Sequence, residues 1–510
     1  MSEFIFKSAT LMGFATTLSR IFGFIRDMVI ANFLGAGFKA DAFFVAFRIP
    51  NLLRRLFGEG SLTASFIPVF TKYKIEKGEE EANRIASISF TMLIIILLII
   101  TSLGVIFSPQ IIKILAPGFK KFPEKFLLSV KLNRIMFPYI FFISLVALCM
   151  GILNSLKHFF APSIAPVFLN ISMIISCIIA YFLKKEIVIF LAYGVVFGGI
   201  LQLILQLIYL KKFKVKIKPD FSFFHPAIKE IIKLMGPSVL GLAVTQIQIF
   251  FNTLLASFLE TGSISYLYYA DRLIQFPLGV FAVSIGNAVL PLISEHRTKK
   301  EISKIQESYL FSIKLILFIS IPACIGLITC GKLIISVLFQ RGEFTHQTVL
   351  AVYYALLSYS LGLFAYSGIR VLTPVFYAYE DTRTPVKIAF ISLCINVGAS
   401  LILMKFFSYV GLALATFISS SFNFFSLCFK IRKHISVDYS IILKYVLKIL
   451  IASAVMGIFL SFVNNYFDYE NFKFFIKAFY LLIIVFLGVA IYLILCKFFK
   501  IEEVKLILKR

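Results

Sequence analysis

The sequence predicts an all-α polytopic membrane protein with about fourteen transmembrane helices, built from two parallel six-helix repeats and two further helices. The 510 residues are 60% apolar and their mean hydropathy is +0.95, which is more apolar surface than a soluble protein of this size can bury. Apolar stretches long enough to cross a bilayer recur along the whole chain. Short segments of the first half also return in the second half at one fixed spacing.

The apolar stretches give the expected spans in order. They are 9–34, 40–70, 82–108, 130–155, 160–183, 187–210, 229–258, 264–294, 305–338, 346–378, 385–405, 408–429, 440–464 and 474–497. The second span contains Pro50, Gly58 and Gly60. We expect a bent or broken helix there, because proline removes a backbone donor and clashes with the preceding turn.

An internal repeat sets the domain organisation. Landmarks recur at an offset of 223: Leu11-Met12-Gly13 and Leu234-Met235-Gly236 (236 − 13), Pro68 and Pro291 (291 − 68), Pro162 and Pro385 (385 − 162). Each unit holds about six helices, and an even number returns the chain to its starting side, so the copies are parallel. We expect an N-terminal lobe at 1–220, a C-terminal lobe at 221–435, and two last helices with a cytoplasmic tail at 436–510.

The loops indicate the orientation. The chain carries 51 Lys+Arg against 25 Asp+Glu, a net charge of +26; biased composition, with no Trp beside 60 Phe, explains most of the lysines. The lysine-rich connections alternate with weakly charged turns, so the positive-inside rule puts both termini in the cytoplasm. The exception is the segment 108–131, whose Lys113, Lys120, Lys121 and Lys125 fall on the outer side. Its alternating pattern suggests a segment at the membrane interface.

Several function classes are disfavoured by what the chain lacks. It has no basic soluble domain for nucleic acid and no nucleotide-binding domain. The seven cysteines form no C-x-x-C pair, and the five histidines have no metal-ligand spacing. We find no clustered nucleophile or metal-binding carboxylates, so we expect no enzyme activity, no cofactor and no metal.

One stretch, 19–60, combines bilayer-like hydropathy with several charges. Its members of interest are Arg20, Arg26, Asp27, Asp41, Arg48 and Arg54. Three arginines facing lipid would cost roughly 7–10 kcal/mol, so we expect them to face each other, carboxylates or a water-filled cavity. Arg272, beside Asp271, supplies a similar charge from the second repeat.

Arginine in this setting favours an anionic substrate. Its planar fork donates two parallel hydrogen bonds to a phosphate or pyrophosphate and stays protonated. The alternative interpretation is structural: Arg26–Asp27 and Arg55–Glu59 would be ion pairs that lock helices together. Intramembrane charges more often mark function, so we favour a pathway for an anionic molecule.

Four segments carry a resemblance to a known family. They are SRIFGFIRDMVIANFLGAG, ADAFFVAFRIPNLLRRLFGEG, YYADRLIQFPLGVFAVSIGNAVLP and RVLTPVFYAYEDTRTPVK. They resemble the MurJ (MviN) family, the lipid II flippases of the multidrug/oligosaccharidyl-lipid/polysaccharide exporter superfamily. The resemblance implies two six-helix lobes around a V-shaped central cavity, with helices 13 and 14 lining a groove. It implies transport of lipid II, the undecaprenyl-pyrophosphate disaccharide-pentapeptide, from the inner to the outer leaflet of the bacterial cytoplasmic membrane.

The resemblance also implies roles for particular residues. Arg20, Arg26, Asp41, Arg54 and Arg272 fall on positions that are important in the family. Arg26 and Arg272 resemble cavity arginines thought to hold the pyrophosphate, and Asp27 would orient Arg26. Arg48 stands where some relatives have lysine.

A departure from the family concerns sodium. Some relatives carry sodium-binding carboxylates in helices 7 and 11. The corresponding stretches here, Gln246–Asn252 and Asn396–Ser400, contain no Asp or Glu.

The expected mechanism is alternating access, with the broken second helix and Pro277 as bending points. The expected partners are lipid II, membrane lipids and proteins of cell-wall synthesis. Two alternatives remain: a flippase for another polyprenyl-pyrophosphate-linked oligosaccharide, and a non-transporting scaffold for cell-wall synthesis. A cation exporter is disfavoured because its cavity would need carboxylates.

Overall fold

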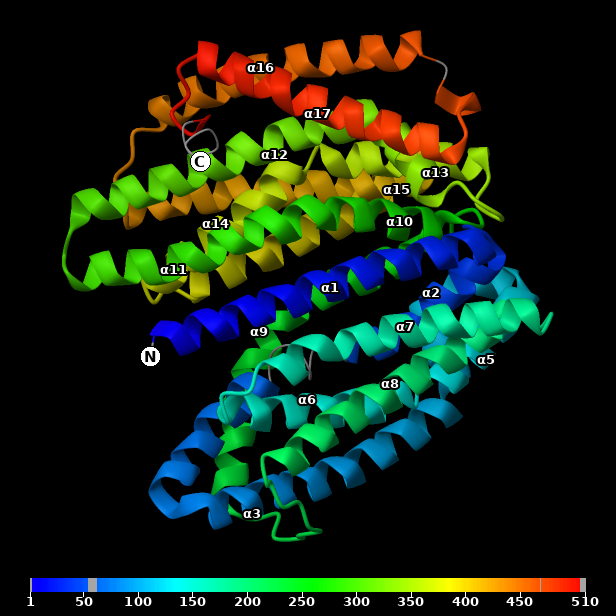
Figure 1. The fold of residues 1–510 in the computed structure, drawn as a ribbon, viewed down its shortest axis with the longest axis vertical. Coiled ribbons are helices and arrows are strands. Elements are labelled where there is room, and N and C mark those ends of the chain that lie inside the picture. Colours follow the sequence, from blue (N-terminus) through cyan, green and yellow to red (C-terminus); the bar gives the residue numbers. More distant parts are fainter. Residues whose placement is uncertain (1, 54–61, 468, 505–510) are drawn as a thin grey trace. The chain divides into compact units, whose positions relative to one another are not determined.

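The computed structural model describes residues 2–53, 62–467 and 469–504, and within these residues every regular element is helical (Figure 1). The prediction of an all-α protein is confirmed. The chain divides into two compact units, Met1–Ile264 with Arg341–Phe344, and Ser265–Gln340 with Thr345–Arg510.

The first unit contains the helices up to α9. They are α1 (Ser2–Leu34), α2 (Phe38–Leu53), α3 (Leu62–Ile106), α4 (Ser108–Leu115), η2 (Pro117–Lys121), α5 (Pro123–Met136), α6 (Tyr139–Ser155), α7 (Phe160–Phe182), α8 (Ile187–Lys212) and α9 (Pro226–Ala256). Helix α7 packs against both α1 and α8, and α3 packs against α6 and α9 (Figure 1). The core between α3 and α6 is made of fully buried apolar side chains, among them Phe66, Ile85 and Cys149.

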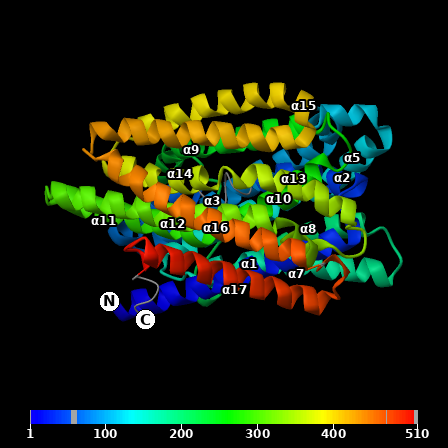
Figure 2. The same cartoon turned by 90° about the horizontal axis from the view of Figure 1, so that it is seen from above.

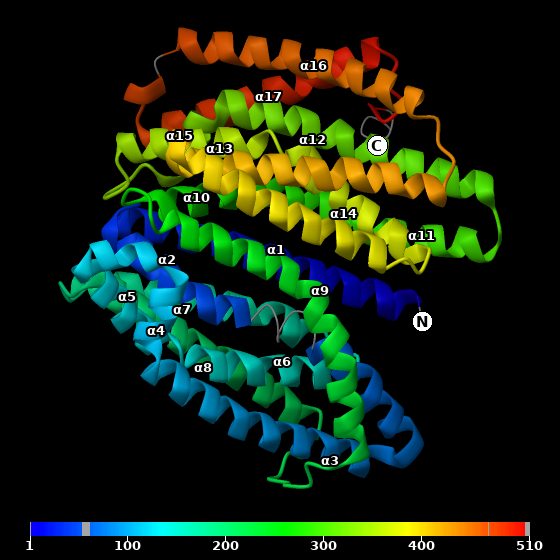
Figure 3. The same cartoon turned by 180° about the vertical axis from the view of Figure 1, so that it is seen from behind.

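The second unit contains the remaining helices (Figures 2 and 3). They are α10 (Ser263–Pro277), η3 (Leu278–Ala282), α11 (Val283–Thr298), α12 (Ile302–Phe339), α13 (His346–Ser360), α14 (Leu363–Ala378), α15 (Arg383–Lys430), η4 (Ile431–Lys433), α16 (Tyr439–Tyr466), η5 (Tyr469–Asn471) and α17 (Phe474–Phe498). Helix α12 is the centre of this unit, because α13, α14, α16 and α17 all pack on it.

Local sequence signals explain where several helices begin. The side chain of His225 accepts a hydrogen bond from the backbone of Ala227 at the start of α9, where Pro226 lacks a donor. Thr345 caps α13 and Asp438 caps α16 in the same way, with bonds of 3.3 and 2.9 Å. Each capped helix therefore starts within a few residues of the predicted span.

Two predicted boundaries coincide with kinks between merged helices. The predicted spans 40–70 and 82–108 are separated by Gly78 (φ 87°, ψ −177°), a non-helical residue within α3. The predicted spans 385–405 and 408–429 are separated at Ser408 (φ 50°, ψ −134°), a non-helical residue within α15. The expected break near Gly58 lies outside the described residues, and α2 continues through Pro50 to Leu53.

The helices of the described residues are long and apolar enough for nine membrane crossings, or ten if the bent pair α13 and α14 is one span. Helix α2, with 16 residues, is too short to count, since it advances only about 1.5 Å per residue. Helices α3 and α15 each merge two helices across a kink. The count is consistent with the predicted fourteen.

The spacing of the repeat recurs in the helix starts. Three pairs share the offset of 223: α5 at Pro123 and α13 at His346, α7 at Phe160 and α15 at Arg383, and the residue after the Gly78 kink, Glu79, and α12 at Ile302. The same offset that relates the sequence landmarks therefore also relates helices of the two units.

A turn from the second half of the sequence belongs to the first unit. In Arg341–Phe344, the backbone N–H of Glu343 donates to Asn32 O at the end of α1, at 2.9 Å. Gly35 and Gly342 both have positive φ, of 60° and 52°. A Cβ on Gly35 would lie 2.5 Å from Glu343 O and one on Gly342 would lie 2.3 Å from Asn32 O. Only glycine fits both positions.

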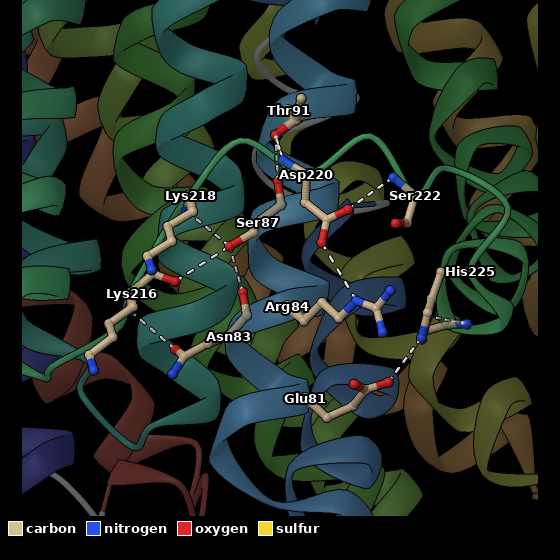
Figure 4. A network of polar contacts seen from close by, with 11 residues as sticks. Glu81, Asn83, Arg84, Ser87, Thr91, Lys216, Lys218, Asp220, Ser222 and His225 are labelled. Atoms are coloured by element: carbon tan, nitrogen blue, oxygen red, sulfur yellow. Dashed lines mark hydrogen bonds and ion pairs between the residues drawn. The ribbon is translucent and has the colours of Figure 1, made fainter.

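The segment that follows α8 is fastened along α3 (Figure 4). Side chains one turn apart on α3 accept hydrogen bonds from alternate backbone N–H groups of this segment: Asn83 from Lys216, Ser87 from Lys218, and Thr91 from Asp220, at 3.1 to 3.2 Å. Four helical residues advance about 6.0 Å and two extended residues about 6.6 Å, so the two registers match. We call residues 213–225 the strap.

Ion pairs add to the strap. Arg84 lies 3.5 Å from Asp220, and His225 lies 2.9 Å from Glu81 (Figure 4). Since His225 Nδ1 accepts from Ala227 N, its Nε2 carries the proton that is donated to Glu81. The second unit has a smaller counterpart: Gln306, 223 residues after Asn83 (306 − 83), donates to Ser436 O at 2.8 Å.

Candidate substrate-binding site

Arg26 is held rigidly inside the first unit. On α1 its Nε and Nη2 donate to Asp27 Oδ1 at 3.0 and 2.7 Å, and its Nη1 donates to Asn170 Oδ1 on α7 at 3.0 Å. Asn170 Nδ2 in turn donates to Ser19 O at 3.2 Å. Arg26 and Asp27 are 7% and 2% exposed. The guanidinium plane is therefore fixed by contacts from two helices.

The structure pairs Arg26 with Asp27. Both interpretations of the sequence, anion binding by Arg26 and a structural ion pair, include this contact. Asn170 was missed by the sequence analysis. Its only signal was a polar residue within an apolar span, which is common at helix contacts and did not point to Arg26. The proposed Arg55–Glu59 pair lies outside the described residues, as does Arg54.

The other basic residues of the stretch differ in burial. Arg20 is exposed on α1, although it lies seven residues before the buried Asp27 and therefore on nearly the same helix face. Arg48 is half-buried on α2. Two residues on the same helix face point in a similar direction, but this does not determine how deeply each side chain is buried in the unit.

Asp41 is part of a different contact. Its Oδ2 lies 2.7 Å from Lys125 Nζ on α5 and also accepts from Gly262 N at 2.7 Å. Both charged side chains are almost fully buried. The sequence predicts that Lys125 lies in a basic segment at the membrane interface and does not predict this pair, since the two residues are 84 positions apart.

Arg272 belongs to the second unit. On α10 its Nε and Nη2 donate to the hydroxyl of Tyr268, one turn earlier, at 3.2 and 2.9 Å. The guanidinium also lies 5.0 Å from the centre of the Tyr268 ring. Asp271 accepts a hydrogen bond from Gln275 at 3.3 Å. Two residues after Gln275, α10 ends at Pro277 and the π-helical turn η3 follows.

The residues at the position of the relatives' sodium site are neutral. Asn396 on α15 donates to Thr416 and Ser419 hydroxyls, both at 3.4 Å. Sodium is a hard cation that prefers oxygen ligands with negative charge among them. The neutral amide and hydroxyl oxygens here do not match that donor set, so these residues do not fit a sodium ion. Within the described residues, no group of three His, Cys, Asp or Glu side chains gathers for another metal.

These features define a class of protein: a polytopic helical membrane protein in which an arginine, Arg26, is buried and held by side chains of two helices. The comparison with known proteins gives the family. The model of the lipid II flippase MurJ family matches residues 30–491, and the chain belongs to that family. Arg20, Arg26 and Asp27 precede the matched range.

Individual relatives agree with this membership. A probable lipid II flippase MurJ of Buchnera aphidicola subsp. Acyrthosiphon pisum is 38% identical over 462 residues, covering 89% of each chain. A protein of the same description from Vibrio cholerae is 38% identical over 433 residues, covering 83% of this chain and 82% of the relative.

Solved structures give the same result. A structure described as lipid II flippase MurJ in an inward closed conformation is similar with a TM-score of 0.82 and 29% identity, covering 98% of this chain and all of that one. A multidrug resistance MATE family transporter in an inward-facing conformation shares the fold, with a TM-score of 0.68 and 16% identity over 81% of this chain and 95% of that one. Family membership makes this chain a membrane transport protein of peptidoglycan biosynthesis and not an enzyme.

Proposed function

We propose that this protein flips lipid II from the cytoplasmic to the outer leaflet of the bacterial inner membrane by alternating access, with Arg26 and Arg272 binding the pyrophosphate. Support for the substrate comes from the family and from relatives described as lipid II flippases. Support for alternating access comes from the shared fold with a transporter in an inward-facing conformation. The proposed units are the lobes 1–220 and 221–435, followed by helices at 436–510, with both termini in the cytoplasm.

The observation that carries the proposal is the fixed guanidinium of Arg26. Asp27 and Asn170 hold three of its nitrogens, so little side-chain entropy is lost when it meets a ligand. The Asp27 carboxylate offsets the positive charge of Arg26 when no ligand is bound. This lowers the free-energy cost of keeping an arginine inside the membrane. A pyrophosphate, with more charge than a carboxylate, would then compete with Asp27 for the same fork.

Arg272 supplies the second cation of the proposal. Tyr268 positions it through the hydroxyl and the ring face. In this proposal each repeat contributes one arginine to the recognition of the pyrophosphate. Pro277 and the π-helical turn after it lie one to two turns beyond Arg272, where a change in helix direction would move the arginine.

Complementation tests the proposal in cells depleted of their own lipid II flippase. Wild type, Arg26→Ala, Arg26→Lys and Arg272→Ala are compared at matched expression, with Lys304→Ala as a control for loss of an exposed charge in α12. We expect wild type and Lys304→Ala to restore growth, both alanine variants to fail, and Arg26→Lys to restore it weakly because lysine keeps the charge without the fork. Growth restored equally by all variants would overturn the arginine assignment while keeping the flippase.

The alternative substrate is another polyprenyl-pyrophosphate-linked oligosaccharide, for which the arginine chemistry is the same. Purified protein in proteoliposomes separates the two, by measuring how fast fluorescent lipid II and a second undecaprenyl-pyrophosphate glycan become accessible on the opposite face. Faster movement of lipid II is expected. Failure of wild type to complement, together with movement of the other glycan, would replace lipid II as the substrate.

A further inference from the structure

A cavity of about 510 Å³ lies in the second unit, and Arg272 is not among the residues that line it. It is formed by α12, α13, α16 and the turn η5. The residues that matter for its chemistry are Lys332, Tyr353, Ser461, Asn465, Tyr469 and Glu470. This cavity has no place in the transport site described above, and it combines a cation, an anion, hydrogen-bonding groups and aromatic faces.

Lys332 is the unusual member of this group. It is a half-buried cation within the apolar helix α12, and its contact is the ring of Tyr353, at 5.3 Å. Among the described residues no carboxylate lies within 4.0 Å of its ammonium, in contrast to Arg26 and Lys125, which each have one. A cation within an apolar helix and without a nearby carboxylate is costly, so its environment favours an anionic ligand.

Another lysine near this cavity shows how the protein satisfies an ammonium internally. Lys477 on α17 donates to Ser336 Oγ and to Glu470 O, both at 3.1 Å. Lys332 has no such set of acceptors in the described residues. Tyr353 is itself held in place, because its hydroxyl donates to Ile328 O at 2.9 Å. The Tyr353 ring and the Lys332 ammonium therefore form a positively charged side of the cavity, and the ring is held in place.

Glu470 provides the opposite charge at the rim. Its backbone oxygen accepts a hydrogen bond from Lys477, and the exposed Glu470 lines the cavity together with Asn465 and Tyr469. A carboxylate beside a tyrosine face and an amide oxygen is suited to a primary ammonium group. One molecule that carries a phosphate and a primary ammonium a few bonds apart matches both ends of this cavity.

We propose that the cavity binds the headgroup of an ethanolamine phospholipid, with its phosphate at Lys332 and its ammonium at Glu470. The position along the helices supports a lipid. Ser461 and Asn465 are in the last two turns of α16, whose other end follows the basic turn Lys430–Lys433. If that turn is cytoplasmic, as in the proposed function, the cavity opens at the level of the outer leaflet. Binding itself does not depend on which leaflet this is.

Lipid titration of the purified full-length protein tests the proposal. Thermal unfolding in detergent is followed while dioleoyl phosphatidylethanolamine, phosphatidylglycerol, phosphatidylcholine or inorganic phosphate is added, and native mass spectrometry counts bound lipids. Lys332→Ala and Glu470→Gln are compared with Lys314→Ala. Lys314 is a matched control. It is also a lysine of α12 whose ammonium lies over a tyrosine ring, that of Tyr445 on α16 at 5.4 Å, and it does not line the cavity.

We expect phosphatidylethanolamine to stabilise wild type and Lys314→Ala equally, and its affinity to fall about tenfold or more in Lys332→Ala. Glu470→Gln should reduce the preference over phosphatidylglycerol, which has the phosphate and lacks the ammonium. Stabilisation by inorganic phosphate alone would replace the lipid with a free anion. Equal responses of Lys332→Ala and Lys314→Ala, or no difference among the lipids, would overturn the proposal. The assay measures binding, so it is independent of whether the protein flips lipid II.

Discussion

Lys125 and Asp41 form a salt bridge of 2.7 Å in which the side chains are only 3% and 1% exposed. The same carboxylate oxygen accepts from Gly262 N at 2.7 Å, and the ammonium lies 4.4 Å from the centre of the Phe119 ring. The contact therefore joins α2, α5 and the turn before α10 through one buried pair. Loss of either partner would leave a charge without compensation in a place that water does not reach.

We predict that Lys125→Met destabilises the protein by about 3–5 kcal/mol, the range found when one partner of a buried ion pair is removed. Urea or SDS unfolding of the purified protein measures the change. Lys121→Met is the control, since Lys121 is exposed in the same basic segment and should stay within about 0.5 kcal/mol of wild type. The double variant Lys125→Met/Asp41→Leu should be more stable than Lys125→Met alone. A Lys125→Met protein as stable as the Lys121→Met control would contradict the structural role of this pair.

The Lys125–Asp41 pair is a contact that the sequence does not predict. Asp41 was recognised as a charge within an apolar span, and Lys125 was recognised as a basic residue that violates the positive-inside rule. Nothing in periodicity or spacing joins residues 84 positions apart, because their contact depends on how α2 and α5 pack. The violation itself was the signal, because one of the lysines that the positive-inside rule disfavours is paired with a buried aspartate.

The fold was more predictable than the site. Long apolar runs placed α7, α8, α16 and α17 within two residues of their observed ends, because hydropathy reports burial in lipid directly. The kinks at Gly78 in α3 and Ser408 in α15 also fall where the sequence separates two spans. For the site, the sequence named Arg26 and Asp27 but missed Asn170, whose contact depends on the approach of α7 to α1.

Asn170 leads to a prediction about transport. Its side-chain oxygen accepts from Arg26 Nη1 at 3.0 Å, and a hydrogen bond to a charged group contributes about 1.5–3 kcal/mol. Asn170→Leu should therefore lower lipid II transport at least tenfold while the protein stays folded. The measurement is the initial rate in proteoliposomes at several lipid II concentrations.

Asn423→Leu is the control for loss of an asparagine from a membrane helix away from Arg26, since Asn423 lies on α15. It should transport at a rate close to wild type, because the buried side-chain oxygen of Asn423 has no hydrogen bond to lose among the described residues. An Asn170→Leu protein with an unchanged concentration dependence would mean that Arg26 is oriented by Asp27 alone.

Tyr268 gives a finer test of Arg272. Tyr268→Phe removes the hydroxyl that accepts from Nε and Nη2 but keeps the ring beneath the guanidinium. We expect a partial loss of transport, roughly three- to tenfold, because the hydrogen bonds are lost and the cation–π contact stays. Tyr268→Leu should lose more, since it removes both. Equal rates for the phenylalanine and leucine variants would show that the ring does not position Arg272.

The strap leads to a local stability prediction. Ser87 accepts from Lys218 N at 3.1 Å, in the middle of three such bonds along α3. Ser87→Ala should cost about 0.5–1.5 kcal/mol and speed hydrogen exchange of the Lys218 amide. Exchange of the Lys214 amide is the internal control, since it bonds to Lys211 O within its own turn. Unchanged hydrogen exchange of the Lys218 amide would contradict the series of hydrogen bonds between the strap and α3.

Acid should open the strap before the rest of the first unit. Hydrogen bonds from the backbone and then the side chain of Ser222, together with the charge of Arg84, lower the pKa of Asp220 below its ordinary value. A carboxyl whose pKa is lower in the folded state stabilises the fold above its unfolded pKa of about 3.9, and this contribution is lost as the pH falls through the folded pKa. Thermal unfolding of wild type and Asp220→Asn should therefore differ by a constant amount between pH 5 and pH 7, and the difference should shrink below about pH 4. Glu79→Gln is the control, because that carboxylate on α3 is 84% exposed and its pair with Lys74 is a surface contact. A difference between wild type and Asp220→Asn that stays constant down to pH 3 would show that the Asp220 charge does not hold the strap to α3.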